Sequence, residues 1–238
     1  MFVDFHSHIL PGIDDGARDL EMSLEMMSML EKQGVGILVA TPHFYPHKQG
    51  LDDFLRIRQN SLDLLNGSRR EGMPVIIPAA EVYIEHDVQN LNLRPLCFEG
   101  TDYLLVELPY SAYESWFIDE VYNLCINQSL TPIFAHLDRY ITIYNQDAIN
   151  EIIDFDDAVI QVNYRALFES KLRKAVIKWI KDGHTVVFGS DCHNVGTRQP
   201  DDLKAVKSVI QSKLGKDWLN QYERFSLEII KGKQYPIA

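Results

Sequence analysis

Two histidines close to the N-terminus are the first residues in the chain that could do chemistry. His6 and His8 are separated by one residue in a segment, residues 3–8, that predicts a β-strand. Side chains alternate along a strand, so Asp4, His6 and His8 are expected on one face, with His6 and His8 roughly 6.5 Å apart along the chain. Two imidazoles at this spacing could bind one metal ion. The same tripeptide also fits two buried histidines bonded to carbonyl groups, so its interpretation depends on the rest of the chain.

More residues of metal-binding type follow short apolar segments. They are Asp15 in the loop after the first strand, His43 after 35–41, Glu81 after 75–80, Glu107 after 103–106, His136 after 132–135, and Asp191 and His193 after 184–189. Seven predicted strands, including the first, are found in this way. Only 158–162, which is followed by Asn163, does not lead into a residue of metal-binding type. With His6 and His8 these are too many donors for one ion with about four to six ligands, so two or three divalent ions are expected. Imidazole and carboxylate donors without thiolate favour Mn, Fe or Zn.

The apolar segments alternate with stretches of helical periodicity. These predict helices over 19–33, 51–66, 114–127 and 169–181, and further helices within 201–231. Strands joined by long crossovers pair in parallel, and continuous apolar strands are covered on both faces. We therefore predict an α/β fold, a distorted seven-stranded (β/α) barrel over residues 1–238 as one domain. Its reactive side chains would lie at the carboxyl ends of the strands.

Composition narrows the classes of partner. A formal net charge of -11 argues against binding nucleic acid or an anionic membrane, and a site for phosphate would then need metal cations. Three widely spaced cysteines indicate a reducing compartment. The N-terminal sequence lacks the pattern of a signal peptide, and no window of 18 uncharged apolar residues predicts a spanning helix. We expect a cytoplasmic protein without membrane insertion.

Several short motifs together resemble a known family. They are His6-Ser7-His8 with Pro11-Gly12-Ile13-Asp14-Asp15-Gly16, Ala40-Thr41-Pro42-His43, Ala80-Glu81, Val106-Glu107, Ala135-His136 and Ser190-Asp191-Cys192-His193. This order resembles the polymerase-and-histidinol-phosphatase (PHP) superfamily, a TIM-like barrel family. Within it the chain is most similar to the bacterial manganese-dependent protein-tyrosine phosphatases of capsule and exopolysaccharide systems. The resemblance implies a trinuclear manganese site, with Fe, Zn or Mg as other candidates. It also implies phosphotyrosine hydrolysis on a bacterial tyrosine autokinase of polysaccharide export.

The resemblance also implies roles for individual residues. One metal would be bound by His6, His8, Glu81 and Asp191, a second by Glu81, Glu107 and His136, and a third by Asp15, His43 and His193. Arg139 and Arg198 match as phosphate-binding arginines, which would hold phosphoryl oxygens while hydroxide attacks phosphorus. The simpler interpretation of these arginines is surface pairing with Asp138 or Asp201. The family more often has a small residue at Cys192.

Three other functions stay open. Residues 192–198 have the Cys-x5-Arg spacing of cysteine-dependent tyrosine phosphatases, in which a thiolate attacks phosphorus. The substrate could instead be a small phosphoester such as histidinol phosphate, or the chain could bind metal without catalysis.

The sequence does not identify the general acid, for which His43 and a metal-bound water are the candidates. Loop tyrosines, among them Tyr110, Tyr140 and Tyr164, could form a shelf for the substrate ring.

Overall fold

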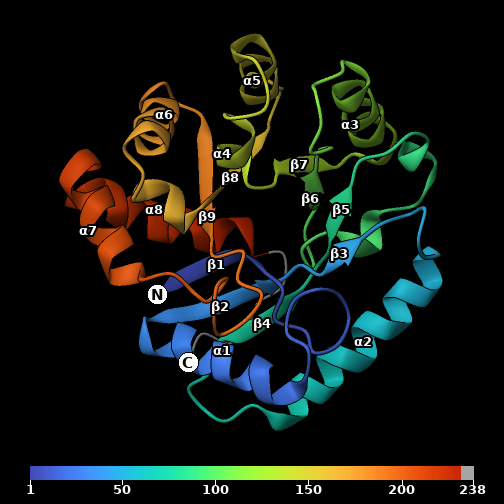
Figure 1. Ribbon diagram of the computed structural model, residues 1–238, viewed down its shortest axis with the longest axis vertical. Coiled ribbons are helices and arrows are strands. Elements are labelled where there is room, and N and C mark those ends of the chain that lie inside the picture. The colour runs from blue at the N-terminus through green and yellow to red at the C-terminus, as the bar shows by residue number, and fades with distance from the viewer. Residues whose placement is uncertain (232–238) are drawn as a thin grey trace.

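The computed structural model describes residues 1–231, which form parallel strands surrounded by helices (Figure 1). The strands are β1 Phe2–Ser7, β2 Val35–Ala40, β3 His43–Phe44, β4 Val75–Pro78, β5 Glu81–Tyr83, β6 Tyr103–Glu107, β7 Thr131–Phe134, β8 Val159–Asn163 and β9 Thr185–Gly189. The helices are α1 Leu20–Lys32, α2 Leu51–Ser68, α3 Trp116–Gln128, α4 Leu137–Tyr140, α5 Gln146–Ile153, α6 Ser170–Lys181, α7 Leu203–Leu214 and α8 Lys216–Ile229. Short 3-10 turns cover η1 Val88–Asn90, η2 Arg94–Leu96 and η3 Tyr164–Leu167. The predicted α/β class with parallel pairing is confirmed.

The strands form two sheets and not one seven-stranded barrel. The sheet orders are β1-β2-β4 and β3-β5-β6-β7-β8-β9, and within residues 1–231 no closed barrel is formed. The prediction of seven strands is wrong because two expected strands are each followed by a further short strand. The 35–41 strand ends at Ala40, before Pro42, which has no N–H for a sheet hydrogen bond, and the 75–80 strand ends at Pro78. The additional strands β3 and β5 follow them and pair in the other sheet.

The first and last strands lie side by side at their carboxyl ends. Asp191 N donates to His6 O at 2.8 Å, and His8 N donates to Cys192 O at 3.0 Å. The pairing of β1 with β2 slips by one residue between Asp4 and Ser7. The backbone is therefore irregular around His6, although His6 and His8 face the same side as expected. Asp4 is buried as expected, with its Oδ1 accepting from Ser190 N at 2.8 Å.

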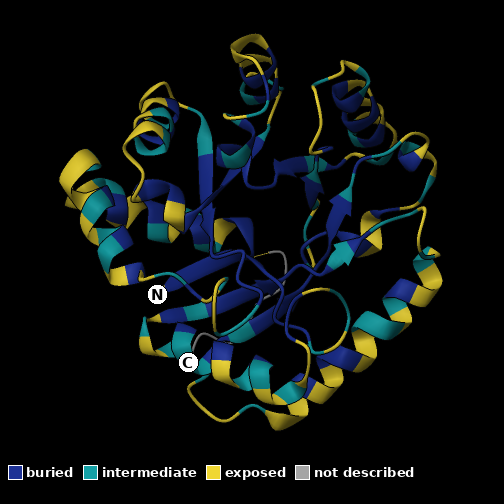
Figure 2. Cartoon of the chain, viewed as in Figure 1, coloured by how far each residue is buried: buried dark blue, intermediate teal, exposed yellow. Residues whose placement is uncertain are grey.

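The strands are buried almost throughout, while the outer faces of the helices are exposed (Figure 2). One buried cluster combines residues of both sheets, including Phe5, Val39, Ile133 and Val187, with Ile229 at the end of α8. Because both sheets contribute, these side chains fill the space between them. A larger cluster packs the outer strand faces against the helices. The strand ends that carry the candidate ligands are thus fixed by packing on both sides.

The helices follow the predicted ranges, and the short helices α4 and α5 are additional. The tail divides at Gly215, whose φ of +91° ends α7 and begins α8. Helix α5 was not predicted, because its apolar stripe is short and its surroundings are polar. Its start is capped by Asn145, whose side chain accepts from Ala148 N at 2.9 Å. Among the helices of residues 1–231, none combines the length and the apolarity that crossing a membrane requires.

Candidate metal centre

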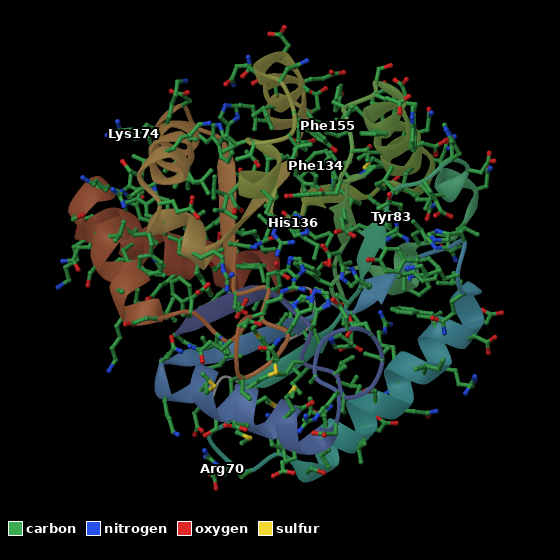
Figure 3. All side chains as sticks on the ribbon, in the orientation of Figure 1. Arg70, Tyr83, Phe134, His136, Phe155 and Lys174 are labelled. Carbon is green, nitrogen blue, oxygen red and sulfur yellow. The ribbon has the colours of Figure 1, made fainter. Side chains whose placement is uncertain are left out.

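The nine predicted ligands come together at one place, the carboxyl ends of the strands. Figure 3 shows His136 near the middle of the molecule in this view, among side chains from several elements. His6, His8, Glu81 and His136 are buried, while Asp15 is exposed at the rim. The sequence thus predicted the position of the cluster correctly. The role of each residue as a ligand stays a prediction.

The first group contains His6, His8, Glu81 and Asp191. The two histidine Nε2 atoms lie 3.1 Å apart, and Glu81 Oε2 lies 3.1 Å from that of His6 and 3.3 Å from that of His8. Asp191 Oδ1 lies 3.7 Å from His6 Nε2 and 3.6 Å from His8 Nε2. All four donors therefore face one small volume.

The second group is built on the other oxygen of Glu81. Its Oε1 lies 2.8 Å from His136 Nε2, which is also 3.6 Å from Glu107 Oε1. His43 also contacts this group, with Nδ1 3.7 Å from Glu107 Oε2, and lies 3.1 Å from Glu81 Oε2 of the first group. Glu81 thus lies between two groups of donors, as expected for a bridging carboxylate.

The third group lies at the exposed rim. Asp15 Oδ1 is 3.5 Å from His43 Nε2 and 3.4 Å from His193 Nε2. The rings of His8 and His193 stack with centroids 3.8 Å apart. His43 therefore presents one ring nitrogen to the third group and the other to the second, a sharing that the sequence did not predict.

The spacing of the donors fits divalent cations. Ligands bound at about 2.1 Å are roughly 3.0 to 3.4 Å from one another in octahedral or tetrahedral geometry, close to most distances above. Several buried donors have no hydrogen-bond partner within residues 1–231, namely His43 Nδ1, Glu107 Oε2 and His193 Nε2. Buried polar atoms normally have partners, so the donor set fits bound metal.

Electrostatics favour a cation at the same place. Burial opposes ionisation of Glu81, yet His6, His43 and His136 hold the pKa of Glu81 well below its usual value. Burial likewise opposes ionisation of Asp191, but His6 and Arg139 hold its pKa below the usual range. The carboxylates are therefore charged, and metal ions can take the place of protons on the neighbouring rings.

Three residues that the sequence did not single out orient the cluster. Asp14 Oδ2 lies 2.7 Å from His8 Nδ1 and accepts from His43 N at 3.0 Å. Gln161 Oε1 lies 3.0 Å from His6 Nδ1 and accepts from His136 N at 2.6 Å. Asn163 Nδ2 donates to Asp191 Oδ2 at 3.0 Å. Strand β8 contributes no ligand, but it supplies two of these three residues.

Backbone strain marks the same region. His136 has φ +33° and Asp191 has φ +50°, in the left-handed region that residues with a Cβ rarely occupy. Such conformations cost about 1 to 3 kcal/mol each and persist where the surroundings enforce them. Here they turn both side chains from the strand ends toward the cluster.

The two predicted arginines contact the cluster and not the surface aspartates. Arg139 forms an ion pair with Asp191 Oδ2, and Arg198 Nη2 donates to Asp191 Oδ1 at 3.1 Å. Arg198 also lies 3.4 Å from Asp15. Asp201 instead faces Arg165 at 3.7 Å. Both guanidinium groups are about one third exposed, so they border the opening of the site.

Cys192 does not suit a nucleophilic role. Its side chain is fully buried, and burial raises the pKa of the thiol well above its usual value. Cys-dependent catalysis needs a thiolate, which requires a lowered pKa and access to substrate. The Cys-x5-Arg interpretation is therefore not supported.

The aromatic surface beside the site differs from the predicted shelf. Tyr140 and Tyr164 are buried in the core, so they are not available to a substrate, whereas Tyr110 is 64% exposed. Tyr45 contacts the His43 ring at 5.1 Å between centroids, and Tyr83 follows at 5.4 Å from Tyr45. The partly exposed pair Tyr45 and Tyr83 is the aromatic surface next to the proposed ligands.

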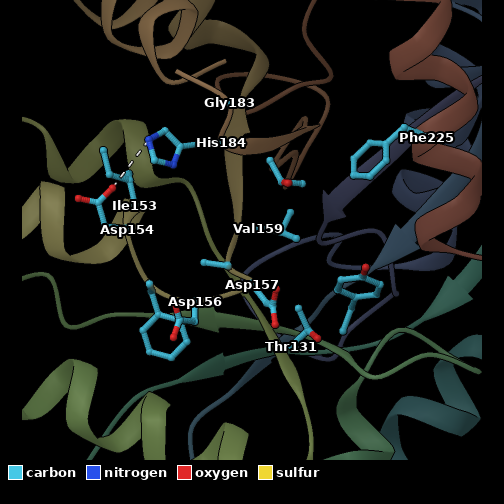
Figure 4. Close-up of a pocket in the computed structure, with 13 residues that line it drawn as sticks. Thr131, Ile153, Asp154, Asp156, Asp157, Val159, Gly183, His184 and Phe225 are labelled. Carbon is cyan, nitrogen blue, oxygen red and sulfur yellow. Dashed lines mark ion pairs between the residues drawn. The ribbon is translucent and has the colours of Figure 1, made fainter. Parts of the chain in front are cut away.

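A separate cavity lies at the opposite end of the second sheet. It has a volume of about 530 Å³ and is lined at the amino ends of β6 to β9 by Tyr103, Thr131, Val159 and Thr185 (Figure 4). His184 and Asp154 face each other there at 3.9 Å. None of the nine candidate ligands lines this cavity.

Parallel strands whose carboxyl ends carry clustered imidazoles and carboxylates define a class, that of α/β proteins with a donor set for several metal ions. Within this class the chain belongs to the family described as capsular polysaccharide synthesis, CpsB/CapC, which matches residues 2–224. The family resemblance predicted from the motifs is confirmed.

Individual relatives agree with this assignment. Tyrosine-protein phosphatase CpsB of Streptococcus agalactiae serotype III (strain NEM316) is 27% identical over 231 residues, covering 92% of this chain and 93% of the relative. Tyrosine-protein phosphatase YwqE of Bacillus subtilis (strain 168) is 27% identical over 223 residues, covering 90% and 86%. A crystal structure from work on YwqE of Bacillus subtilis and CpsB of Streptococcus pneumoniae, described as metal-dependent tyrosine phosphatases, superposes with a TM-score of 0.77. It covers 98% of this chain and 96% of the other at 21% identity, which establishes the shared fold.

Proposed function

We propose that this chain is a metal-dependent phosphomonoesterase that hydrolyses phosphotyrosine in proteins. The observation that carries the proposal is the convergence of nine imidazole and carboxylate donors, bordered by two arginines, at one opening. Its relatives are named tyrosine-protein phosphatases, which favours phosphotyrosine over histidinol phosphate or another small phosphoester. The same names argue against a catalytically silent metal-binding protein.

Three divalent ions, most simply manganese, would be held as the family resemblance implies. The first would be bound by His6, His8, Glu81 and Asp191, the second by Glu81, Glu107 and His136, and the third by Asp15, His43 and His193. Bound cations supply charge neutralisation of the phosphoryl group and an acidified water.

The chain's own residues would bind and orient the substrate. Arg139 and Arg198 would exchange part of their contact with Asp191 for phosphoryl oxygens, which guanidinium binds in bidentate fashion. Tyr45 and Tyr83 would contact the tyrosine ring at the rim. Asp14 and Gln161 would keep the rings of His8 and His6 turned so that Nε2 faces the cations.

The family supports a proposal about the cellular context. We propose a cytoplasmic protein, consistent with its three free cysteines, whose substrate is a tyrosine autokinase of polysaccharide export. The proposed function is tested by comparing rates on phosphotyrosine peptides, phosphoserine peptides and histidinol phosphate with manganese present. Preference for phosphotyrosine, abolished by EDTA, is expected. Preference for histidinol phosphate would overturn the choice of substrate.

A further inference from the structure

Charge is distributed unevenly along the chain. Residues 1–157 contain 26 Asp and Glu against nine Lys and Arg, whereas residues 158–238 contain 14 Lys and Arg against eight Asp and Glu. Helix α6 is the most basic element, since Ser170–Lys181 holds four lysines and one arginine and no acidic residue. A chain with a net charge of -11 thus carries a local cationic surface, and such asymmetry is a feature of surfaces that bind anionic partners.

The lysines of α6 form one exposed stripe. Lys171, Lys174, Lys178 and Lys181 recur at intervals of three or four residues, so they share one side of the helix, and all four are exposed. Figure 3 shows Lys174 at the periphery of the molecule. Lys178 pairs with Asp182 but its side chain is still 73% exposed. The other three make no ion pair within residues 1–231.

Two of these lysines border a groove between α5 and α6. The groove has a volume of about 470 Å³, and Lys171 and Lys178 line it from α6. Its apolar part includes Ile149 and Trp179, both buried. Glu151 of α5 bonds to Tyr113 Oη at 2.8 Å and does not line the groove. The groove therefore offers an apolar floor and a cationic edge.

The groove is linked to the proposed active site by packed aromatic rings. The His136 ring contacts the Tyr140 ring at 5.7 Å between centroids, and Tyr140 stacks on Tyr144 at 4.7 Å. Tyr144 lines the groove, and Arg139 lies in the same short segment. Only the buried ring of Tyr140 therefore separates His136 from Tyr144 in the lining of the groove.

We propose that the α5–α6 groove docks an acidic segment of the phosphotyrosine protein substrate, an inference that rests on the proposed function. Acidic side chains of the segment pair with the α6 lysines, and an apolar side chain packs on Ile149 and Trp179. An extended chain advances about 3.3 Å per residue, so the test places acidic residues at positions three to six on either side of the phosphotyrosine. A flat anionic membrane is disfavoured because the remaining surface is acidic, whereas a single segment can enter the groove.

The test compares two charge-reversal variants. The groove variant is K171E/K174E/K178E, and its matched control is K204E/K213E/K216E, which reverses three exposed lysines of α7 and α8 that do not line the groove. Substrates are p-nitrophenyl phosphate, a phosphotyrosine peptide with Glu at flanking positions three to six on both sides, and the same peptide with Gln there. Binding of the unphosphorylated Glu peptide to the metal-loaded protein is measured by fluorescence anisotropy, and docking is read without catalysis because this peptide carries no phosphate.

The groove variant is expected to raise KM for the Glu peptide and weaken its binding at least tenfold, while the control is affected much less. Rates on p-nitrophenyl phosphate and the Gln peptide should stay unchanged in both. Equal behaviour of the two variants toward the Glu peptide would overturn the docking proposal. The proposal would also be overturned if the groove variant lost binding to phosphatidylglycerol vesicles but bound the Glu peptide as the wild type does. Wild-type protein that hydrolyses no phosphotyrosine substrate would instead overturn the proposed function, while anisotropy would still decide docking.

Discussion

The side-chain oxygen of Gln161 contacts two groups of the candidate centre, one side-chain nitrogen and one backbone N–H. Because it accepts from His6 Nδ1 and His136 N, it fixes which nitrogen of His6 faces the other donors. We expect Gln161→Leu to weaken metal binding by about 10- to 100-fold, the usual cost of losing such a contact. Metal titration with a competing fluorescent chelator measures this. Gln59→Leu, on the exposed side of α2, is the control, and equal affinity in both variants would refute the role of Gln161.

The arginines at the opening are predicted to act on the phosphoryl group. Arg139→Ala and Arg198→Ala should each lower turnover of a phosphotyrosine peptide at least tenfold, because each removes a charged donor to the transition state. Metal content is expected to be retained. Arg165→Ala, which removes an exposed arginine facing Asp201, should leave turnover near that of the wild type. Normal kinetics in either Arg139→Ala or Arg198→Ala would exclude that residue from the reaction.

Cys192 separates the metal-dependent mechanism from the thiolate mechanism. Cys192→Ser should keep most of its activity, because the thiol is buried and its pKa is raised, and EDTA should still abolish hydrolysis. Rates with and without EDTA decide this. Inactivity of a folded, metal-loaded Cys192→Ser protein would favour the covalent route.

At the scale of elements, strand β9 must approach β1 closely to bring Asp191 to His6. A Cβ on Gly189 would lie 2.6 Å from His6 Cβ and 2.9 Å from its backbone nitrogen. Gly189→Ala should therefore destabilise the protein by about 1 to 3 kcal/mol and weaken metal binding. Gly67→Ala, in α2 with nothing within 4 Å of the added Cβ, should stabilise by about 0.5 to 1 kcal/mol. Urea unfolding measures the stability of both variants. If Gly189→Ala had the stability of the wild type, the two strands would tolerate separation.

The elements also show what the sequence could predict. Continuous apolar segments located the strands, and the residue types after them located the candidate ligands, because both depend on local sequence. The short strands β3 and β5 were missed because they lie beyond the apolar segments, and strand pairing is a long-range property. Asp14 and Gln161 were missed for a related reason, since an acceptor for a histidine ring can come from any neighbouring strand. The sharing of His43 between two groups depends on ring orientation, which spacing does not reveal.

At the scale of the whole molecule, the candidate centre joins β1, β3, β5, β6, the β7 end and the segment after β9. Metal bound by such distant segments favours the folded state and so should raise its stability. Chelation is expected to lower the midpoint of thermal unfolding, and manganese to restore it.

One cooperative transition would support the prediction that residues 1–238 form a single domain, whereas two separate transitions would argue against it.

The most direct test of the central claim is the metal content of the purified protein, measured by elemental analysis together with phosphotyrosine hydrolysis before and after chelation. Convergence of the nine donors predicts about two to three divalent ions per chain, and activity that is lost on stripping and recovered with manganese. Protein that contains less than one ion per chain and hydrolyses phosphotyrosine at an undiminished rate in EDTA would contradict it.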